Sequence, residues 1–205
     1  MWSSDITKAF DYAMYNHRTQ TRKAMGSVPY GSHLMAVTAI VLECGGTKAE
    51  AIAALLHDVV EDTDRTLHDI QVLFGDEVMS IVAQVSEDKS LKWEDRKRAA
   101  ITHVADMTDS GLLVKCADVL HNTGTLLSDF DGIDWSFFEK GKHVTLHKYS
   151  SVLKALVNEV TQRQNFAPVI MERLGKTYAN FQELVLTHCC DSDPRKVYDW
   201  FKGEE

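Results

Sequence analysis

The segment AALLHDVVEDT, residues 53–63, ends an apolar run with a cluster of ionisable side chains. On a helix, His57 and Asp58 are neighbours, while Glu61 and Asp62 follow one turn later. Carboxylates this close repel one another unless protons or a cation compensate their charge. A divalent metal held by His57 and Asp58 would remove the repulsion and leave Glu61 and Asp62 free to position substrate or transfer protons.

Two side chains do not complete a metal site, and two further donors occur in apolar helical surroundings. His33 follows the sequence PYGS and begins an apolar helix. Asp118 lies within LVKCADVLHNTGTL, where Lys115, His121 and Asn122 fall within about one turn of it. An aspartate inside a leucine-rich helix needs a partner. The resulting set of two histidines and two aspartates suits Mn²⁺, Fe²⁺ or Zn²⁺, and mixed nitrogen and oxygen ligation does not distinguish them.

Each of these residues also has a purely structural interpretation. His33 can be a capping or core histidine, and Asp118 can simply pair with Lys115. Glu61 and Asp62 can cap or solvate a helix end. The metal-site interpretation depends on the residues occurring together, each in an apolar helical frame.

Apolar residues recur at helical spacing along most of the chain, which predicts an all-α protein. A charged stretch at residues 89–99 is expected to be a loop that enters a helix. No fixed-period repeat and no linker divides the chain, so we expect a single-domain helical bundle over residues 1–205. The apolar positions of the expected helices cover residues 6–14, 34–41, 51–56, 67–74, 78–85, 112–127, 152–160 and 169–186, and the third helix is expected to continue to the turn-prone residues 62–64.

The composition of the chain limits the classes of function that we expect for it. The chain has 205 residues, of which 44% are hydrophobic, and this is enough for one domain with a sizeable core. A net charge of −8 argues against a nucleic-acid or anionic-membrane partner. Neither a signal peptide nor an apolar run near the ~20 residues needed to span a bilayer is seen. We therefore expect a cytoplasmic protein that acts on a small molecule, with its oligomeric state left open.

Four stretches of the sequence resemble the HD-domain superfamily of metal-dependent phosphohydrolases. They are HRTQTRKAMGSVPYGSH, LLHDVVEDTDRTLHDIQVLFGDEV, EDKSLKWEDRKR and VKCADVLHNTGTL. Within the superfamily, the sequence is similar to the hydrolase domain of the RelA/SpoT homologues, above all to the stand-alone small alarmone hydrolases. The resemblance runs over residues 10–127, and it implies that helices within residues 130–205 complete an HD-type bundle.

The resemblance implies a role for each candidate residue. The metal, usually Mn²⁺ in this family, would be bound by His33, His57, Asp58 and Asp118. Glu61 and Asp62 match the family positions to which water activation and proton handling are assigned. Substrate contacts are implied for Arg22, Lys23, Lys115 and Asn122.

The reaction implied by the resemblance is hydrolysis of (p)ppGpp, guanosine 3′-diphosphate 5′-(di/tri)phosphate, to pyrophosphate and GDP or GTP. Two alternatives stay open. The same centre could act on (p)ppApp or on the 2′-phosphate of NADPH, since Val119 stands where the family often has a basic residue. A non-catalytic HD module that binds a nucleotide would share the fold, but it would have no need of so costly a charged cluster.

Overall fold

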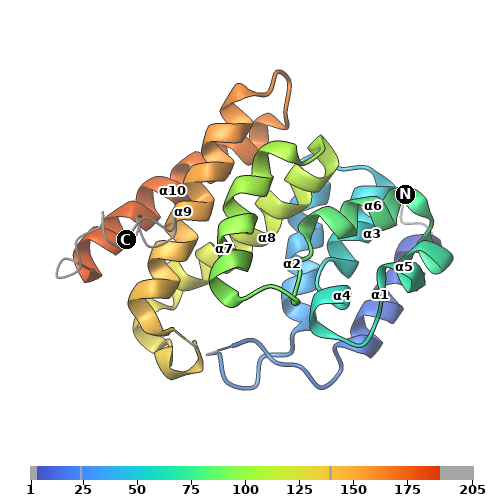
Figure 1. Cartoon of the computed structure of the whole chain (residues 1–205), viewed down its shortest axis with the longest axis horizontal. Coiled ribbons are helices and arrows are strands. Elements are labelled where there is room, and N and C mark those ends of the chain that lie inside the picture. Colours follow the sequence, from blue (N-terminus) through green and yellow to red (C-terminus); the bar gives the residue numbers. More distant parts are fainter. Residues whose placement is uncertain (1–3, 24, 139, 190–205) are drawn as a thin grey trace.

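The computed structural model describes residues 4–23, 25–138 and 140–189 (Figure 1). Within these ranges the secondary structure is helical, apart from one isolated β-bridge between Thr21 and Pro29. The predicted all-α fold class is therefore confirmed. The α-helices are α1 Ser4–Asn16, α2 Gly31–Glu43, α3 Lys48–Leu56, α4 Val59–Asp62, α5 Leu67–Phe74, α6 Asp76–Val85, α7 Trp93–Thr102, α8 Asp109–Ser128, α9 Gly141–Gln162 and α10 Pro168–His188. Short 3₁₀ helices are η1 His103–Asp106, η2 Phe130–Gly132 and η3 Trp135–Phe137.

Helix α3 lies at the centre of the core because it is apolar on nearly every side. Its residues from Ala49 to Leu56 are all buried, as expected for a helix without a polar face. It packs against α1, α2, α6 and α8. A capping box fixes its start, because Thr47 Oγ1 accepts the Glu50 N–H and the Glu50 carboxylate accepts the Thr47 N–H. The packing and the capped start fix the position of the C-terminal end of α3, which His57 follows.

Helix α3 ends at Leu56, whereas the sequence predicted one helical segment running through HDVVED. His57 and Asp58 form a turn, and α4 begins at Val59. At the break, the Ala54 carbonyl accepts a hydrogen bond from His57 Nδ1 at 2.8 Å. Asp58 keeps φ −98° and ψ −6°, and its carbonyl accepts the Asp62 N–H at 2.8 Å. The one-turn spacing from Asp58 to the carboxylates of α4 is therefore preserved.

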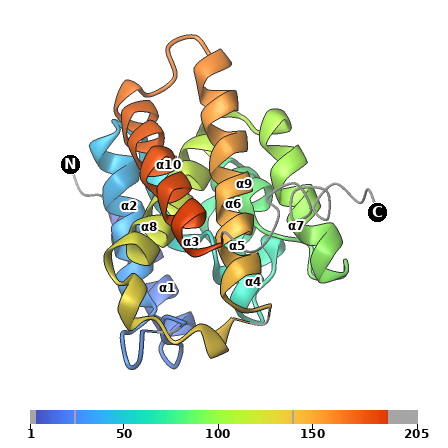
Figure 2. The ribbon, with the colours of Figure 1, turned by 90° about the vertical axis from the view of Figure 1, so that its left-hand side faces the viewer.

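Helices α9 and α10 lie side by side and pack along α8 (Figures 1 and 2). Pro168 occupies the first position of α10, where its missing N–H costs nothing. Leu153 and Leu156 of α9 and Leu174 and Phe181 of α10 are fully buried between these elements. The last part of the expected C-terminal region, residues 190–205, lies outside the described residues.

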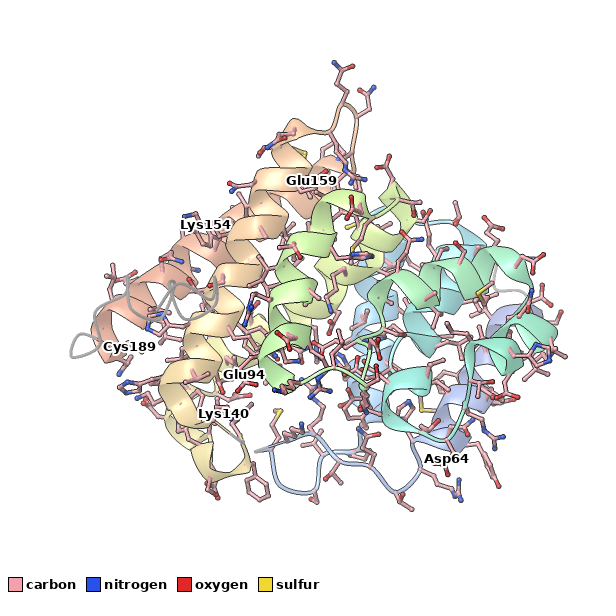
Figure 3. All side chains as sticks on the ribbon, in the orientation of Figure 1. Asp64, Glu94, Lys140, Lys154, Glu159 and Cys189 are labelled. Carbon is pink, nitrogen blue, oxygen red and sulfur yellow. The ribbon has the colours of Figure 1, made fainter. Side chains whose placement is uncertain are left out.

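Helix α7 forms where the charged stretch 89–99 was expected to enter a helix, and it packs against α9. Glu94 in its first turn and Lys140, just before α9, form an ion pair at 3.5 Å (Figure 3). An exposed pair of this kind contributes little to stability, because water and salt screen it. It nonetheless marks the place where α7 meets the C-terminal helices, and this contact shapes one wall of the site described below.

Candidate metal centre

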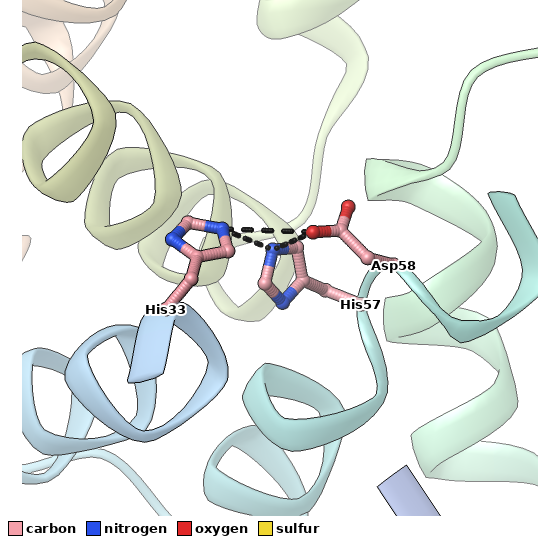
Figure 4. Close-up of side chains that lie close together, drawn as sticks. All are labelled: His33, His57 and Asp58. Carbon is pink, nitrogen blue, oxygen red and sulfur yellow. Dashed lines mark hydrogen bonds and ion pairs between the residues drawn. The ribbon is translucent and has the colours of Figure 1, made fainter. Parts of the chain in front are cut away.

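The predicted metal donors come together from three parts of the chain. His33 lies in the first turn of α2, His57 and Asp58 form the α3–α4 junction, and Asp118 lies in the middle of α8. His57 Nε2 is 3.2 Å from His33 Nε2 and 3.0 Å from Asp58 Oδ2, and His33 Nε2 is 3.3 Å from Asp118 Oδ1. Among the described residues, His33, His57 and Asp58 form a group whose donor atoms lie within 4.8 Å of one another (Figure 4).

Hydrogen bonds on the far side of each imidazole orient the two histidines. His57 Nδ1 lies 2.8 Å from the Ala54 carbonyl, which can only accept, so Nδ1 carries the proton. His33 Nδ1 lies 2.8 Å from His121 Nδ1. Burial and the nearby His33 lower the pKa of His121 to about 4, so His121 is neutral and can accept the His33 proton. Both Nε2 atoms are then free to act as ligands, the arrangement usual for metal-bound histidine.

The electrostatics of the cluster favour positive charge at the point where the donors meet. Burial would raise the pKa of Asp58 and Asp118, but His33 and His57, together with Lys115 beside Asp118, hold both pKa values well below the usual range. Burial opposes a charged His57, yet Asp58 and Asp118 raise its pKa to about 9. The same aspartates therefore attract a proton or any other cation to this point.

The two remaining carboxylates of the motif lie in different surroundings. Burial, with the neighbouring charges of Glu87 and Asp58, raises the pKa of Glu61, and Glu61 Oε2 accepts the Glu87 N–H at 3.2 Å. Asp62 is more exposed, accepts a hydrogen bond from Gln20 Nε2 at 2.9 Å and lies 3.4 Å from Lys89 Nζ. Of these two carboxylates, Glu61 is therefore desolvated, whereas Asp62 is solvated and contacts Gln20 and Lys89.

The residues predicted to contact substrate line one cavity of about 350 Å³, onto which Asp58, Glu61, Asp62 and Asp118 also open. Arg22 Nη2 donates to Asn122 Oδ1 at 2.7 Å, and Asn122 Nδ2 donates to Asp118 Oδ1 at 2.6 Å. Lys115 Nζ lies 3.3 Å from Asp118 Oδ2. A continuous set of polar contacts therefore joins three of these residues to the donor cluster. The lining residues predicted from sequence are Arg22, Lys23, Lys115 and Asn122.

The structure adds side chains that sequence reasoning did not assign to the site. Tyr30 Oη donates to Asp58 Oδ2 at 2.5 Å, and Gln20 holds Asp62 as described. Both residues fall in the first stretch that carries the family resemblance, and that stretch is the sequence signal for them. Lys97 of α7 and Lys148 of α9 also line the cavity; Lys97 falls in the third stretch that carries the resemblance, whereas no local sequence pattern points to Lys148.

The fold and the donor cluster agree with a comparison against protein families. A family model described as the HD domain matches residues 9–129, more than half of the chain, and the chain belongs to this family.

Individual relatives resemble the chain more specifically than the family model does. Guanosine-3′,5′-bis(diphosphate) 3′-pyrophosphohydrolase MESH1 of Drosophila melanogaster is 40% identical over 122 residues, which cover 58% of this chain and 68% of the relative. The Homo sapiens protein of the same name is 38% identical with the same coverage. The bifunctional (p)ppGpp synthase/hydrolase SpoT of Escherichia coli is 36% identical over 127 residues, 59% of this chain and 18% of the relative.

Solved structures extend the likeness to most of the chain. A metazoan ortholog of SpoT, described as hydrolysing ppGpp, superposes with a TM-score of 0.75 at 30% identity and covers 91% of this chain and 99% of its own. The lmo0812 protein of Listeria monocytogenes gives a TM-score of 0.62 at 30% identity, covering 75% and 98%. The resemblance to stand-alone RelA/SpoT-type hydrolases is confirmed. Within the described residues, every helix is too short or too polar to span a membrane.

Proposed function

We propose that this protein is a metal-dependent (p)ppGpp 3′-pyrophosphohydrolase, which releases pyrophosphate and returns GDP or GTP. The observation that carries the proposal is that a histidine–aspartate donor cluster and several cationic side chains meet at a single cavity. A polyphosphate substrate needs both, since its negative charge must be offset before water can attack phosphorus. Relatives named for this reaction support the same substrate.

The chemistry of the donor set fits a divalent cation. Two imidazole nitrogens face each other at 3.2 Å, and aspartate oxygens lie 3.0 and 3.3 Å from them. Nitrogen and carboxylate donors in this combination suit Mn²⁺ and related ions. We assign Mn²⁺ to His33, His57, Asp58 and Asp118. When bound, the ion supplies Lewis acidity that lowers the pKa of water and offsets phosphate charge.

Glu61 is assigned to proton transfer from the attacking water. Its burial raises the pKa of the carboxyl, and a carboxylate with a raised pKa is a stronger base near neutral pH. Asp62 is assigned to orienting the attacking water, because Gln20 and Lys89 hold its carboxylate in a fixed position. The attack is at the phosphorus attached to the 3′ oxygen, and the nucleoside 3′ oxygen leaves.

Arg22, Lys23, Lys115 and Asn122 are assigned to substrate binding. Asn122 holds the Arg22 guanidinium, whose carbon lies 5.7 Å from the centre of the Tyr30 ring. A planar guanidinium in a fixed position can pair with phosphate oxygens or stack on a base. Lys115 brings an ammonium group next to Asp118, where phosphate charge would approach the donor cluster.

A free nucleotide is the proposed ligand, without a nucleic-acid or membrane partner, and the net charge of −8 supports this choice. The expected cytoplasmic location remains part of the proposal. Fractionation of cells that express the tagged protein tests it, and recovery with membranes would contradict it.

The test of the proposed function is product formation by the Mn²⁺-loaded protein on ppGpp, ppApp and NADPH, each with a chelated control. Pyrophosphate released from ppGpp, and lost on chelation, is the expected result. Faster turnover of ppApp, or phosphate released from NADPH, would assign the same centre to another substrate. No turnover of any of the three, with the metal bound, would favour a nucleotide-binding module without catalysis.

A further inference from the structure

Three lysines from three different helices line the cavity beside the candidate metal centre. They are Lys97 of α7, Lys115 of α8 and Lys148 of α9. Helix α9 packs against both α7 and α8, and the three helices lie next to one another in Figure 1. The HD-domain match ends at residue 129, so Lys148 lies beyond the residues that the family model matches.

Two of the three ammonium groups form ion pairs with carboxylates of the cavity. Lys97 Nζ lies 2.5 Å from Glu87 Oε1, and Lys115 Nζ lies 3.3 Å from Asp118 Oδ2. Asp118 also belongs to the proposed metal ligands, so its charge is shared. Within the part of the chain that the structure describes, Lys148 has no carboxylate at ion-pair distance, and its ammonium group lies 4.3 Å from the centre of the Tyr149 ring.

Burial and neighbouring positive charge act against the charged form of two of these lysines. Burial lowers the pKa of Lys148 and the charge of Lys115 adds to this, although Glu87, Asp118 and Glu61 act in the opposite direction. Burial and the charge of Lys148 likewise lower the pKa of Lys97. Partly desolvated cations that act on one another in this way are stabilised by a bound anion.

We propose that Lys148, with Lys97 and Lys115, forms a subsite for the terminal phosphate of a 3′-diphosphate. Lys115 links the subsite to the metal centre, since it contacts Asp118 and its charge also acts on Lys148. A second phosphate bonded to the reacting one would therefore meet these ammonium groups. The subsite would favour a diphosphate over a monophosphate as the reacting group. This inference rests on the proposed function and specifies how the substrate is selected.

The first test is direct binding, which does not require turnover. Isothermal titration measures the affinity of pyrophosphate and of orthophosphate for the wild type, Lys148→Met, Lys148→Arg and Lys142→Met at one fixed Mn²⁺ concentration. Lys142 lies on the same helix but packs over Phe130, so Lys142→Met is the matched control. We expect Lys148→Met to weaken pyrophosphate binding about tenfold, the cost of one lost charged contact. Orthophosphate binding should change less than about twofold, and Lys148→Arg should keep most of the affinity.

The second test separates the 3′-diphosphate from the 5′-phosphates of the nucleotide. It compares the KM of ppGpp with the dissociation constant of ppGp, which has the same 5′-diphosphate but only one 3′-phosphate. Lys148→Met should weaken only the interaction with ppGpp, with little change in kcat. Equal weakening for both nucleotides would assign Lys148 to the 5′-phosphates and overturn the subsite.

The two proposals fail in different ways. Wild-type pyrophosphate affinity in a folded Lys148→Met variant that still hydrolyses ppGpp would overturn the subsite and leave the proposed function standing. A tenfold loss of pyrophosphate binding, in a wild-type protein that hydrolyses none of the nucleotides, would support the anion subsite and contradict the proposed function.

Discussion

The Nε2 atoms of His33 and His57 face each other at 3.2 Å, although one residue begins α2 and the other follows the end of α3. Two unprotonated nitrogens at this separation repel each other, so the contact requires a proton or a metal ion between or beside them. Asp58 and Asp118 supply negative charge at the same point. This contact forms one side of the proposed metal centre.

Asp58→Asn should remove bound Mn²⁺ and activity together, because an amide oxygen is a much weaker ligand than a carboxylate. Helix content should stay nearly unchanged, since Asp58 lies at a turn between α3 and α4. Metal analysis, circular dichroism and ppGpp turnover measure the three quantities. Asp64→Asn, an exposed acidic position nearby, is the matched control. Full activity of Asp58→Asn without metal would refute its assignment as a ligand.

His121→Ala should lower Mn²⁺ affinity by about 10- to 100-fold, the usual cost of removing the partner that orients a metal-bound histidine. The reason is the 2.8 Å contact between the Nδ1 atoms of His121 and His33. Titration with Mn²⁺ measures the change, with His68→Ala on the exposed side of α5 as control. Unchanged affinity would show that packing alone orients His33.

Glu61→Gln should keep the metal but slow turnover by about 10²- to 10⁴-fold, the range expected for a lost general base. Metal content and kcat are measured in parallel, and Glu77→Gln on the surface of α6 controls for the change of charge. A wild-type kcat would transfer the proton-handling role to Asp62 or to another group.

Arg22→Ala should raise KM about tenfold with a smaller effect on kcat, because a lost contact that binds substrate and transition state equally appears in KM. Initial-rate kinetics separate the two constants. Arg18→Ala is the control, since Arg18 is exposed and stacks on Tyr15 outside the cavity. A fall in kcat alone would place Arg22 in contact with the transition state.

Phe181→Ala should destabilise the protein by about 3–5 kcal/mol, since it leaves a cavity where α10 packs against α9. Phe181 is fully buried and lies edge-on to Tyr149, 6.5 Å between ring centres. Chemical denaturation measures the free energy of unfolding. Leu186→Ala, at a position 62% exposed on the same helix, should change it by less than about 0.5 kcal/mol. Similar values for the two variants would mean that α10 contributes little to the cooperative core.

The helical fold could be predicted from sequence because its signal is local. Apolar spacing located α1, α2, α8 and α10 to within a few residues at most of their ends. The break at His57 escaped prediction because the residues on both sides favour a helix, and no local pattern marks the hydrogen bond from His57 Nδ1 to the Ala54 carbonyl.

The candidate site was predictable where an ionisable side chain lies in an apolar helix. Asp118 was notable because a carboxylate in a leucine-rich helix needs a partner, and the structure brings it to His33. Lys148 carried no such signal, since a lysine on an amphipathic helix is ordinary. Only the packing of α9 against α7 and α8 brings it to the cavity.

The most direct test of the account is the fate of solvent oxygen during ppGpp hydrolysis in H₂¹⁸O by the Mn²⁺-loaded protein. Mass spectrometry of the products locates the label. Attack at the phosphorus beside the 3′ oxygen predicts ¹⁸O in pyrophosphate, unlabelled GDP, and neither product after chelation. Label in the 3′ hydroxyl of GDP, or orthophosphate in place of pyrophosphate, would contradict the proposed reaction at this centre.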